Sequence, residues 1–585
     1  MKKKNFAINF SLKKVKHSYL FIFVLISLIT IFSYYVLIKN SFVDETMLYS
    51  WNWIVNYLDV KMFFSLLIVI FFISYFIAKV DFKIKDNYFL IFIFITAFFL
   101  SSLFWSAPDP NPDVAEFFGV AKYIKINGLF DYFKSFGTDD LRKYRFHSLH
   151  PFLGLAFQLF GESPLVIHII MSSLYAFIPV LTFFLAKKLF SRKIAFISSF
   201  LVIAMPNMVV QSSMFLVDVP TVFFVLLALL SFHFFLHDRK IISYFLTVFT
   251  LLFAMTSKRP ASLFLILSLF VLFLIAKRHN GFKLKSFGLR SFVVFYIVFV
   301  VLFSFVFLKM DFFSEQLLLD LSQANIIGNP PHYVNPFSYF FQIQPLTVFL
   351  FLIFLVLFAF KPKLSNLFLI AWIFFPYIFI HDTTVRYMLP AFPAIAIAAA
   401  IVLSKFKKQI IVFSVSVIVL SSILSLVLGY IPLLKNEFYD NNIKLAADYV
   451  DSLDVETVGV YMHYKDVIYK TSPKTEIYGY VFDYYSSKRV YYDVSESVRA
   501  VYNNGFERFN IFDYYKDEKD ENYFHPSHDA VVVFSNVLDW ENINYSDVKA
   551  LKKTIEKDYF LERTFSIGKS GIEENKFGFV YVEIN

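Results

Sequence analysis

The chain has 585 residues, is 58% hydrophobic and has a mean hydropathy of +0.60, whereas soluble domains are roughly 45–50% apolar. Because the apolar residues come in long uncharged runs, this composition excludes an ordinary soluble protein and indicates a membrane protein. The net charge of +10 does not indicate a nucleic-acid partner, since the basic residues lie mostly in short loops between apolar runs. The absence of cysteine excludes disulfides, thiolate metal sites and a cysteine nucleophile.

The first apolar run, 19–38, follows a basic N-terminal stretch. It is longer than the 7–15 residues typical of the core of a signal peptide, and no small-residue cleavage site follows it. We therefore expect a retained first membrane helix that is preceded by a cytoplasmic N-terminus.

Taking about 20 apolar residues per span and allowing shorter ones, the sequence predicts about thirteen membrane helices. The predicted spans are 19–38, 62–78, 88–105, 165–186, 194–211, 217–236, 241–256, 260–276, 291–308, 345–360, 366–380, 388–404 and 410–430. Alternate loops are rich in lysine and arginine, which predicts that they are cytoplasmic. The N-terminus would then be cytoplasmic, and residues 106–164, 309–344 and 431–585 would lie outside. Pro206 interrupts the fifth run, and one span fewer there would move the C-terminal region to the other side.

The predicted fold class is a polytopic α-helical membrane protein with a C-terminal soluble α/β domain. We expect three parts: a cytoplasmic flank and two membrane helices in 1–87, a catalytic membrane module in 88–430, and an extracytoplasmic domain in 431–585. In the last part, residues 441–452 have the pattern of a helix, and alternating apolar residues predict strands at 455–462, 488–493, 529–536 and 576–584.

Two carboxylates stand at the head of the first outer loop. Three prolines end the preceding helix, and Asp113 and Glu116 follow at the start of a new helical pattern. At a spacing of three residues, both carboxylates share one face of that helix. They could act in catalysis, or Asp113 could simply cap the helix.

Another acid, Asp218, begins a span at the outer boundary and is followed by Pro220. It could be a plain cap, but an ionisable group at a membrane edge is also a candidate functional residue. Lys258, Arg259 and Arg386 lie in tight outer turns, where a positive-inside chain should avoid cations. They could extend to lipid headgroups, or they could hold a phosphate beneath the surface.

Two histidines, His147 and His150, precede an apolar stretch that is too short to span a membrane. This stretch predicts an amphipathic helix at the surface. The histidines could bind phosphate, ligate a metal or cap the helix.

Five motifs in this order resemble the type C glycosyltransferase superfamily, and specifically its protein O-mannosyltransferase and aminoarabinose transferase group. They are Asp113, the segment SLHPFLGLAFQLFG, the DVP at Asp218, the turn TSKRP and the segment RYMLPAFP. The resemblance covers about residues 88–404. Two positions differ from the common pattern, because Val114 replaces an acid after Asp113 and Arg259 replaces a glycine after Lys258.

The resemblance implies an inverting glycosyltransferase of the cell membrane. It would move a sugar from a polyprenyl phosphate to a protein, lipid or glycan acceptor at the outer face. Asp113 would be the catalytic base, assisted by Glu116, and Asp218 would orient a basic group or the acceptor. The resemblance assigns donor binding to a further set of residues: His150, Lys258, Arg259, Arg386 and Tyr387. Asp113 and Glu116 could also hold a Mg²⁺ or Mn²⁺ ion.

The sequence leaves two other classes of protein open. A transporter or a flippase for lipid-linked glycans would place ionisable residues near the middle of the bilayer. The spans are nearly free of charge, whereas acids and bases gather at the outer boundary, which favours chemistry at the surface. A catalytically inactive scaffold with an external binding domain is the remaining alternative.

Overall fold

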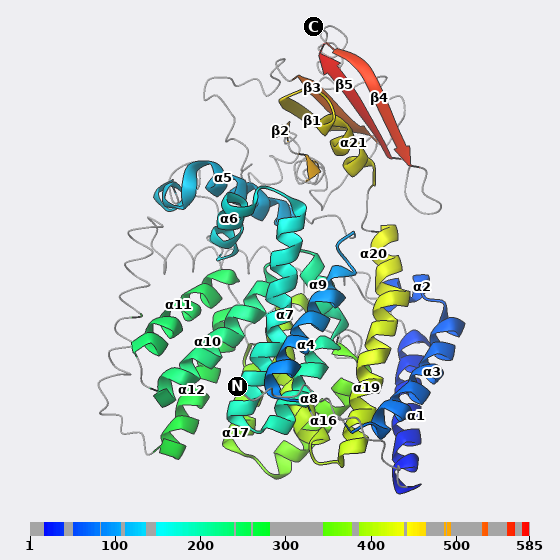
Figure 1. The fold of residues 1–585 in the computed structure, drawn as a ribbon, viewed down its shortest axis with the longest axis vertical. Coiled ribbons are helices and arrows are strands. Elements are labelled where there is room, and N and C mark those ends of the chain that lie inside the picture. The colour runs from blue at the N-terminus through cyan, green and yellow to red at the C-terminus, as the bar shows by residue number, and fades with distance from the viewer. Residues whose placement is uncertain are drawn as a thin grey trace, which may run out of the picture. The chain divides into compact units, whose positions relative to one another are not determined.

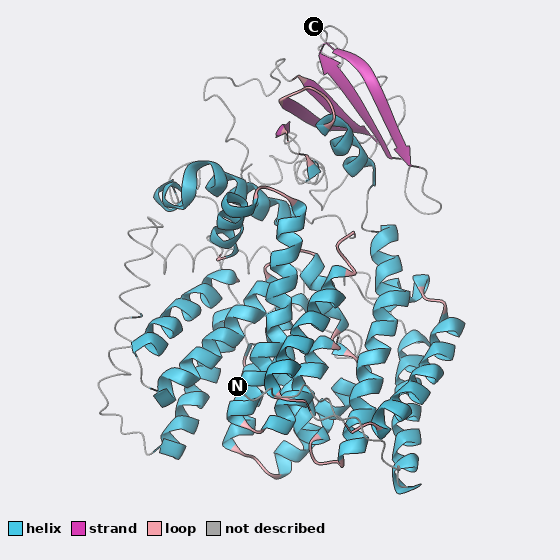
Figure 2. Ribbon diagram, viewed as in Figure 1, coloured by secondary structure: helices cyan, strands magenta, loops and turns pink. Residues whose placement is uncertain are grey.

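The computed structural model describes residues 17–39, 51–81, 84–106, 112–135, 148–238, 241–258, 261–280, 296, 343–376, 385–437, 441–463, 482, 485–486, 488–492, 529–535, 559–567 and 576–583. The chain divides into two compact units. The first contains residues 1–108, 168–304 and 311–438, and the second contains 109–167, 305–310 and 439–585. Figure 1 shows the elements in chain order, and Figure 2 shows that the described strands are confined to the C-terminal part of the chain.

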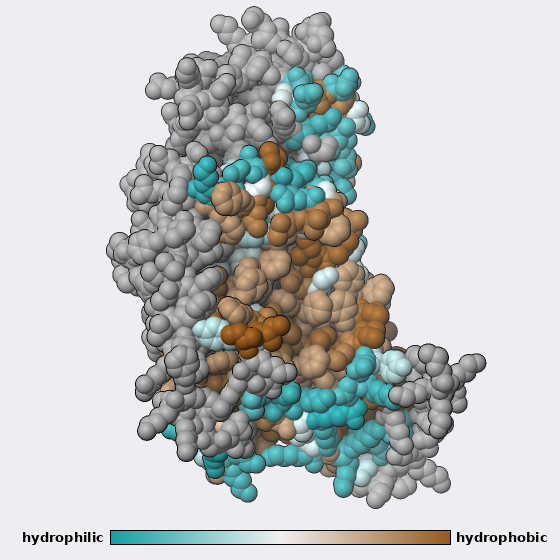
Figure 3. Space-filling model, turned by 60° about the vertical axis from the view of Figure 1, so that its left-hand side comes forward, coloured by the Kyte–Doolittle hydropathy of each residue, from teal (hydrophilic) through white to brown (hydrophobic). Residues whose placement is uncertain are grey.

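The first unit is a bundle of apolar helices. Its described helices are α1 (His17–Lys39), α2 (Trp51–Tyr57), α3 (Val60–Lys79), α4 (Asp86–Ser102), α7 (Pro164–Leu189), α8 (Arg192–Ile203), α9 (Pro206–Ser213), α10 (Asp218–Asp238), α11 (Ile241–Ser257), α12 (Ala261–Asn280), α16 (Pro345–Phe360), α17 (Leu364–Phe374), η2 (Val385–Ala391), α18 (Phe392–Leu403), α19 (Lys408–Ser425), η3 (Leu426–Tyr430) and α20 (Ile431–Glu437). On the face in Figure 3, apolar side chains form a broad band over the bundle, and hydrophilic side chains gather at its lower end.

Most of the predicted spans coincide with these helices. Five described helices are long and apolar enough to cross a membrane, or six if the bent pair of α8 and α9 forms one span. Six further apolar helices of 10–17 residues are described. The predicted span 291–308 lies outside the described residues except for Tyr296. The chain is therefore a membrane protein, and the count of thirteen spans stays a prediction.

The bend between α8 and α9 has a clear cause at Pro206. Proline lacks the backbone N–H that would continue the helix, so α8 ends at Ile203 and α9 begins at Pro206, at an angle of 56°. The break exposes the backbone carbonyl of Ala204, which accepts a hydrogen bond of 2.7 Å from Ser422 Oγ on α19. The interruption that the sequence indicated is thus a buried and hydrogen-bonded bend.

Several loops that the sequence predicts to be cytoplasmic meet at one end of the bundle. Asp86, at the start of α4, pairs with Lys187 at 2.7 Å and with Arg192 at 2.6 Å. Lys193 Nζ donates to the carbonyl of Ser404 at 2.5 Å, and Lys408 pairs with the carboxylate of Asp81. We refer to this end as the basic end of the bundle.

Within the second unit, α5 (Pro112–Ser135) and α6 (Leu149–Phe160) pack as a pair. Gly154 allows their close approach, because a Cβ atom there would lie 2.4 Å from a methyl carbon of Ile124. Gln158 Nε2 donates to the carbonyl of Ile124 at 2.8 Å, and Lys122 pairs with Glu162 at 2.7 Å. The short amphipathic helix predicted here is α6, which buries one face on α5 and exposes a second face of large apolar side chains.

The same unit contains a sheet of five strands in the order β2-β1-β3-β5-β4. Its elements are α21 (Asn441–Asp451), β1 (Thr457–His463), β2 (Arg489–Tyr492), β3 (Ala530–Ser535), β4 (Tyr559–Ile567) and β5 (Lys576–Glu583). β1 is parallel to β2 and β3, and β5 is antiparallel to β3 and β4. β1, β2, β3 and β5 fall on the four predicted strand segments, and β4 is additional.

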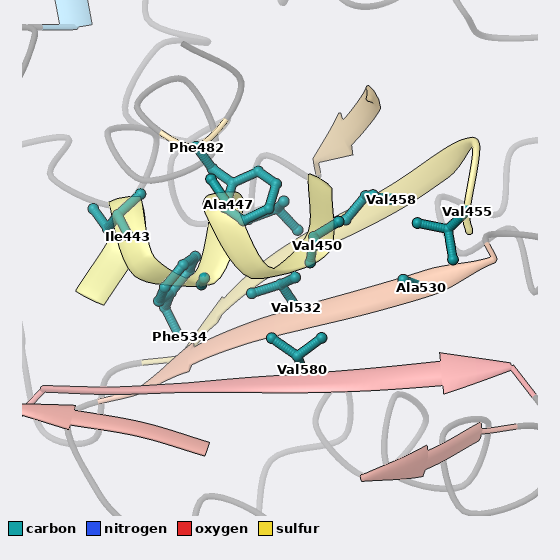
Figure 4. Close-up of a cluster of buried hydrophobic side chains, with 12 residues drawn as sticks. Ile443, Ala447, Val450, Val455, Val458, Phe482, Ala530, Val532, Phe534 and Val580 are labelled. Atoms are coloured by element: carbon teal, nitrogen blue, oxygen red, sulfur yellow. The ribbon is translucent and has the colours of Figure 1, made fainter. Parts of the chain in front are cut away.

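The sheet and α21 enclose an apolar core. Ala447 and Val450 of α21 lie over Val532 of β3 and Val580 of β5, as Figure 4 shows. At the edge of this core, the hydroxyl of Tyr449 donates to Glu562 on β4 at 3.0 Å. Desolvation, together with this hydrogen bond to the carboxylate, raises the pKa of the Tyr449 phenol above its ordinary value of 10.0.

Candidate functional site

A buried ion pair lies at the end of the bundle opposite the basic end. Asp218 is in the first turn of α10, and Lys258 directly follows α11, so the antiparallel pair of helices brings the two residues together. The side chain of Asp218 is 2% exposed and that of Lys258 is 14% exposed, and Lys258 Nζ donates to the Asp218 carboxylate. A carboxylate this deeply buried requires a counter-charge, which Lys258 supplies. Asp218 thus lies next to a basic group, and its role in orienting that group or the acceptor stays a prediction.

The turn that leads into α10 is strained. Phe215 has a φ of 56°, a conformation that is rare for a bulky side chain, and it is 2% exposed. Its ring packs edge-to-face on His168 of α7, with 4.5 Å between the ring centroids. Such strain costs about 1–3 kcal/mol and is concentrated at functional sites. Nothing in the sequence signals this strain, because hydropathy carries no information about φ.

A chain of hydroxyl groups joins three helices beside this turn. Trp105 Nε1 donates to Ser172 Oγ of α7 at 2.9 Å. Ser101 of α4 lies 2.8 Å from Ser172 and 2.6 Å from Ser212 of α9. Ser101, Ser172 and Ser212 are buried, so these hydrogen bonds fix α4, α7 and α9 at the end of the bundle where α10 begins. The sequence analysis missed the chain because its members are single residues far apart in sequence.

A second strained residue, Gln344, lies directly before α16. It has a φ of 100° and is fully buried. Its Oε1 accepts from the backbone N–H of Thr347 at 2.8 Å, which caps the helix, and its Nε2 donates to Ser421 Oγ at 3.3 Å. The residue therefore links the end of the predicted second outer loop to α19.

The remaining predicted donor-binding residues are described less fully. Arg386 and Tyr387 lie on η2, which packs against α10 and α12. The side chains of both residues, and the whole of Arg259, lie outside the described residues. Their roles in donor binding stay predictions.

Asp113 and Glu116 lie in the first turn of α5, as the helical pattern predicts, and their side chains are outside the described residues. His150, at the start of α6, is fully buried, and its Nδ1 lies 3.1 Å from the hydroxyl of Tyr132. Its ring also packs on Phe117 of α5, so in this structure His150 joins the two helices. Binding of phosphate by His150 stays a prediction, and His147 is not described.

A metal site is likewise untested. Among the described residues, no group of three or more histidine, aspartate or glutamate side chains could hold a metal ion. The side chains of Asp113 and Glu116 lie outside that part of the chain, so an ion between them stays a prediction.

Comparison with known proteins gives a consistent result. Residues 150–306 match the family described as dolichyl-phosphate-mannose-protein mannosyltransferase, and this range includes both Asp218 and Lys258. No curated protein matches the sequence. ArnT from Cupriavidus metallidurans in the apo state has a similar fold, with a TM-score of 0.50 at 10% identity over 84% of this chain and 97% of ArnT. ArnT bound to undecaprenyl phosphate gives a TM-score of 0.51 at 10% identity, over 85% and 98% of the two chains. The family match covers residues 150–306 alone, and the structural comparison shows that this chain has a fold similar to that of ArnT.

Proposed function

We propose that this protein transfers a sugar from a polyprenyl phosphate donor to an acceptor hydroxyl at the outer face of the membrane. The observation that carries the proposal is the buried pair of Asp218 and Lys258, which lies in the segment that matches the mannosyltransferase family. Support also comes from ArnT, a protein of the same fold with a structure bound to undecaprenyl phosphate.

In this mechanism the acceptor oxygen attacks the anomeric carbon of the sugar and inverts it. Asp113 accepts the proton of the acceptor hydroxyl, with Glu116 beside it, as the bond between the sugar and the phosphate oxygen breaks. The electron pair of that bond leaves with the polyprenyl phosphate, whose negative charge increases. Cations that are already in position stabilise this charge without reorganisation of solvent.

We assign the stabilisation of the leaving phosphate to Lys258, Arg259 and Arg386, with Tyr387 and His150 as further donor-binding groups. Asp218 holds the ammonium of Lys258 in place. Because Asp218 already neutralises Lys258 in the resting protein, the arginines would supply the excess positive charge that a phosphate requires. A Mg²⁺ or Mn²⁺ ion held by Asp113 and Glu116 would add to this stabilisation.

The test uses cells that lack the protein and are complemented with the wild type or with Asp113→Asn. Mass spectrometry of cell-surface proteins and glycans should reveal a sugar that depends on the wild type and is absent with Asp113→Asn. The matched control is Asp109→Asn, which removes a neighbouring carboxylate from the same proline-rich stretch. Unchanged transfer by Asp113→Asn, at equal amounts of protein in the membrane, would refute the role of Asp113.

A second measurement separates transfer from transport. With an acceptor present, purified protein in vesicles should release free polyprenyl phosphate from the lipid-linked donor as the sugar passes to the acceptor hydroxyl. A flippase would move the intact lipid across the bilayer without breaking its bond to the sugar. Movement without cleavage would contradict the proposal.

A further inference from the structure

At the basic end of the bundle, a cavity of about 190 Å³ lies where α1, α3 and α19 meet. This volume far exceeds the roughly 10–15 Å³ that a single water requires. The cavity is remote from Asp218 and Lys258, because α4 runs from Asp86 at the basic end to Ser101 in the hydroxyl chain at the opposite end. The proposed transfer reaction therefore makes no use of it.

One part of the cavity wall is cationic. Lys79, Lys407 and Lys408 line it together with a single carboxylate, that of Asp81. Lys408 pairs with Asp81, so these four side chains carry an excess of two positive charges. Lys79 Nζ lies 4.2 Å from the ring centroid of Tyr75, which restrains its position. The wall is thus suited to an anion.

Another part of the wall is apolar. Tyr19, Ala78 and Val412 line it, and they pack on an apolar cluster in which the rings of Phe23 and Phe413 stack at 4.2 Å. A small water-soluble anion would gain nothing from this wall. An amphiphile with a charged head and an apolar body satisfies both parts.

The surface beside the cavity is that of a lipid-facing helix pair. Phe21 of α1 is 72% exposed, and Phe76 of α3 is 61% exposed. In a membrane protein, exposed side chains of this kind contact acyl chains. Figure 1 shows α1, α3 and α19 side by side, and α3 and α19 pack closely.

We propose that this cavity binds the headgroup phosphate of an anionic glycerophospholipid, whose acyl chains lie along α1 and α3. Lys79 and Lys407 contact the phosphate, and the first turn of α19 adds the favourable field of a helix N-terminus. The bound lipid bridges the two N-terminal membrane helices and the remainder of the bundle. This site differs from the donor site in position, and it takes a phosphate from the opposite leaflet.

The test variant is Lys79→Ala/Lys407→Ala, measured with the full-length protein in detergent. It keeps Lys408, because removal of Lys408 would leave the buried carboxylate of Asp81 without its ion pair. The matched control is Lys361→Ala/Lys363→Ala, which removes two exposed lysines from a loop that is also predicted to be cytoplasmic. Native mass spectrometry with phosphatidylglycerol and with phosphatidylcholine of the same acyl chains measures the bound lipid.

We expect the wild type and the control to retain phosphatidylglycerol over phosphatidylcholine, and the test variant to bind phosphatidylglycerol about tenfold more weakly. Equal retention of phosphatidylglycerol by the test variant and the control would overturn the proposal, as would equal retention of the two lipids by the wild type. Complete displacement of the lipid by millimolar inorganic phosphate would also overturn it, because the site would then be one for the free anion. Equal melting temperatures without lipid establish that the test variant is folded.

Discussion

The ion pairs of Asp86 at the basic end and the pair of Asp218 and Lys258 at the opposite end have the same chemistry in different surroundings. At the basic end, Asp86 pairs with Lys187 and Arg192, whose side chains are 41% and 55% exposed. At the opposite end, Asp218 is 2% exposed and Lys258 is 14% exposed. Water and salt screen the first set of charges, whereas the second pair is almost withdrawn from solvent.

This difference separates structural charges from candidate functional ones. Exposed ion pairs contribute about 0–1 kcal/mol, and the positions of Lys187 and Arg192 are sufficiently explained by membrane orientation. A buried pair usually gives no more stability than apolar residues of the same size would give. Stability alone therefore does not account for the presence of Asp218 and Lys258, and the strained Phe215 lies three residues before Asp218.

The largest expected effect follows from the replacement of one of the two partners in the buried ion pair. In Lys258→Met, the buried carboxylate of Asp218 loses the counter-charge that it has among the described residues, which should lower the free energy of unfolding by about 3–5 kcal/mol. Transfer should fall at least about 100-fold, because a cation next to the leaving phosphate is lost. Unfolding in mixed detergent and release of polyprenyl phosphate measure the two effects.

The double variant Asp218→Asn/Lys258→Met separates stability from function. It removes both charges, so most of the lost stability should return while transfer remains lost. Recovery of transfer together with stability would show that the pair is only structural, and the contrast between the two ends would then disappear.

Gln344 provides a smaller test at the same end as the buried pair. Gln344→Ala removes the cap of α16 and the hydrogen bond to Ser421, and the loss of both should lower the free energy of unfolding by about 2 kcal/mol. The alanine still carries a side chain at a φ of 100°. Gln344→Gly removes the same hydrogen bonds but tolerates this φ, so it should be less destabilising by about 1 kcal/mol. If glycine is no better than alanine in thermal unfolding, the positive φ costs the protein nothing.

The hydroxyl chain should show an effect of about 1 kcal/mol. Ser101→Ala removes the shared partner of Ser172 and Ser212, both of which are buried. The adjacent Ser102→Ala is the matched control, because the hydroxyl of Ser102 bonds within its own helix, to the carbonyl of Phe99 at 2.8 Å. Thermal unfolding should distinguish the two variants, and equal melting temperatures would contradict a role of this chain in fixing α4, α7 and α9.

The sequence predicted those features that depend on local composition. Hydropathy located the helices of the bundle, and the break at Pro206 followed from the chemistry of proline. Asp218 and Lys258 were each identified from their position at a membrane boundary. Their pairing could not be predicted, since it depends on how α10 and α11 pack across 40 residues of sequence.

Features that depend on tertiary structure were missed. β4 has Glu562 and Arg563 at its centre, and an irregularity in its register between Leu561 and Arg563 breaks the alternation by which strands are recognised. The positive φ values of Phe215 and Gln344 run against the ordinary preference of both residue types, so only the packed structure reveals them.

The smallest expected effect is at the basic end, where one substitution tests whether an exposed ion pair contributes to stability or to sugar transfer. Lys187→Ala removes one of the two partners of Asp86 and leaves Arg192 in place, so the free energy of unfolding should change by no more than about 1 kcal/mol. Because both lysine and water can solvate an exposed carboxylate, this small difference should shrink further in 0.5 M salt. Sugar transfer should stay at the level of the wild type. A loss of transfer in Lys187→Ala with unchanged stability would mean that the exposed charges also act in catalysis, and burial would no longer distinguish Asp218 and Lys258 from the ion pairs of Asp86.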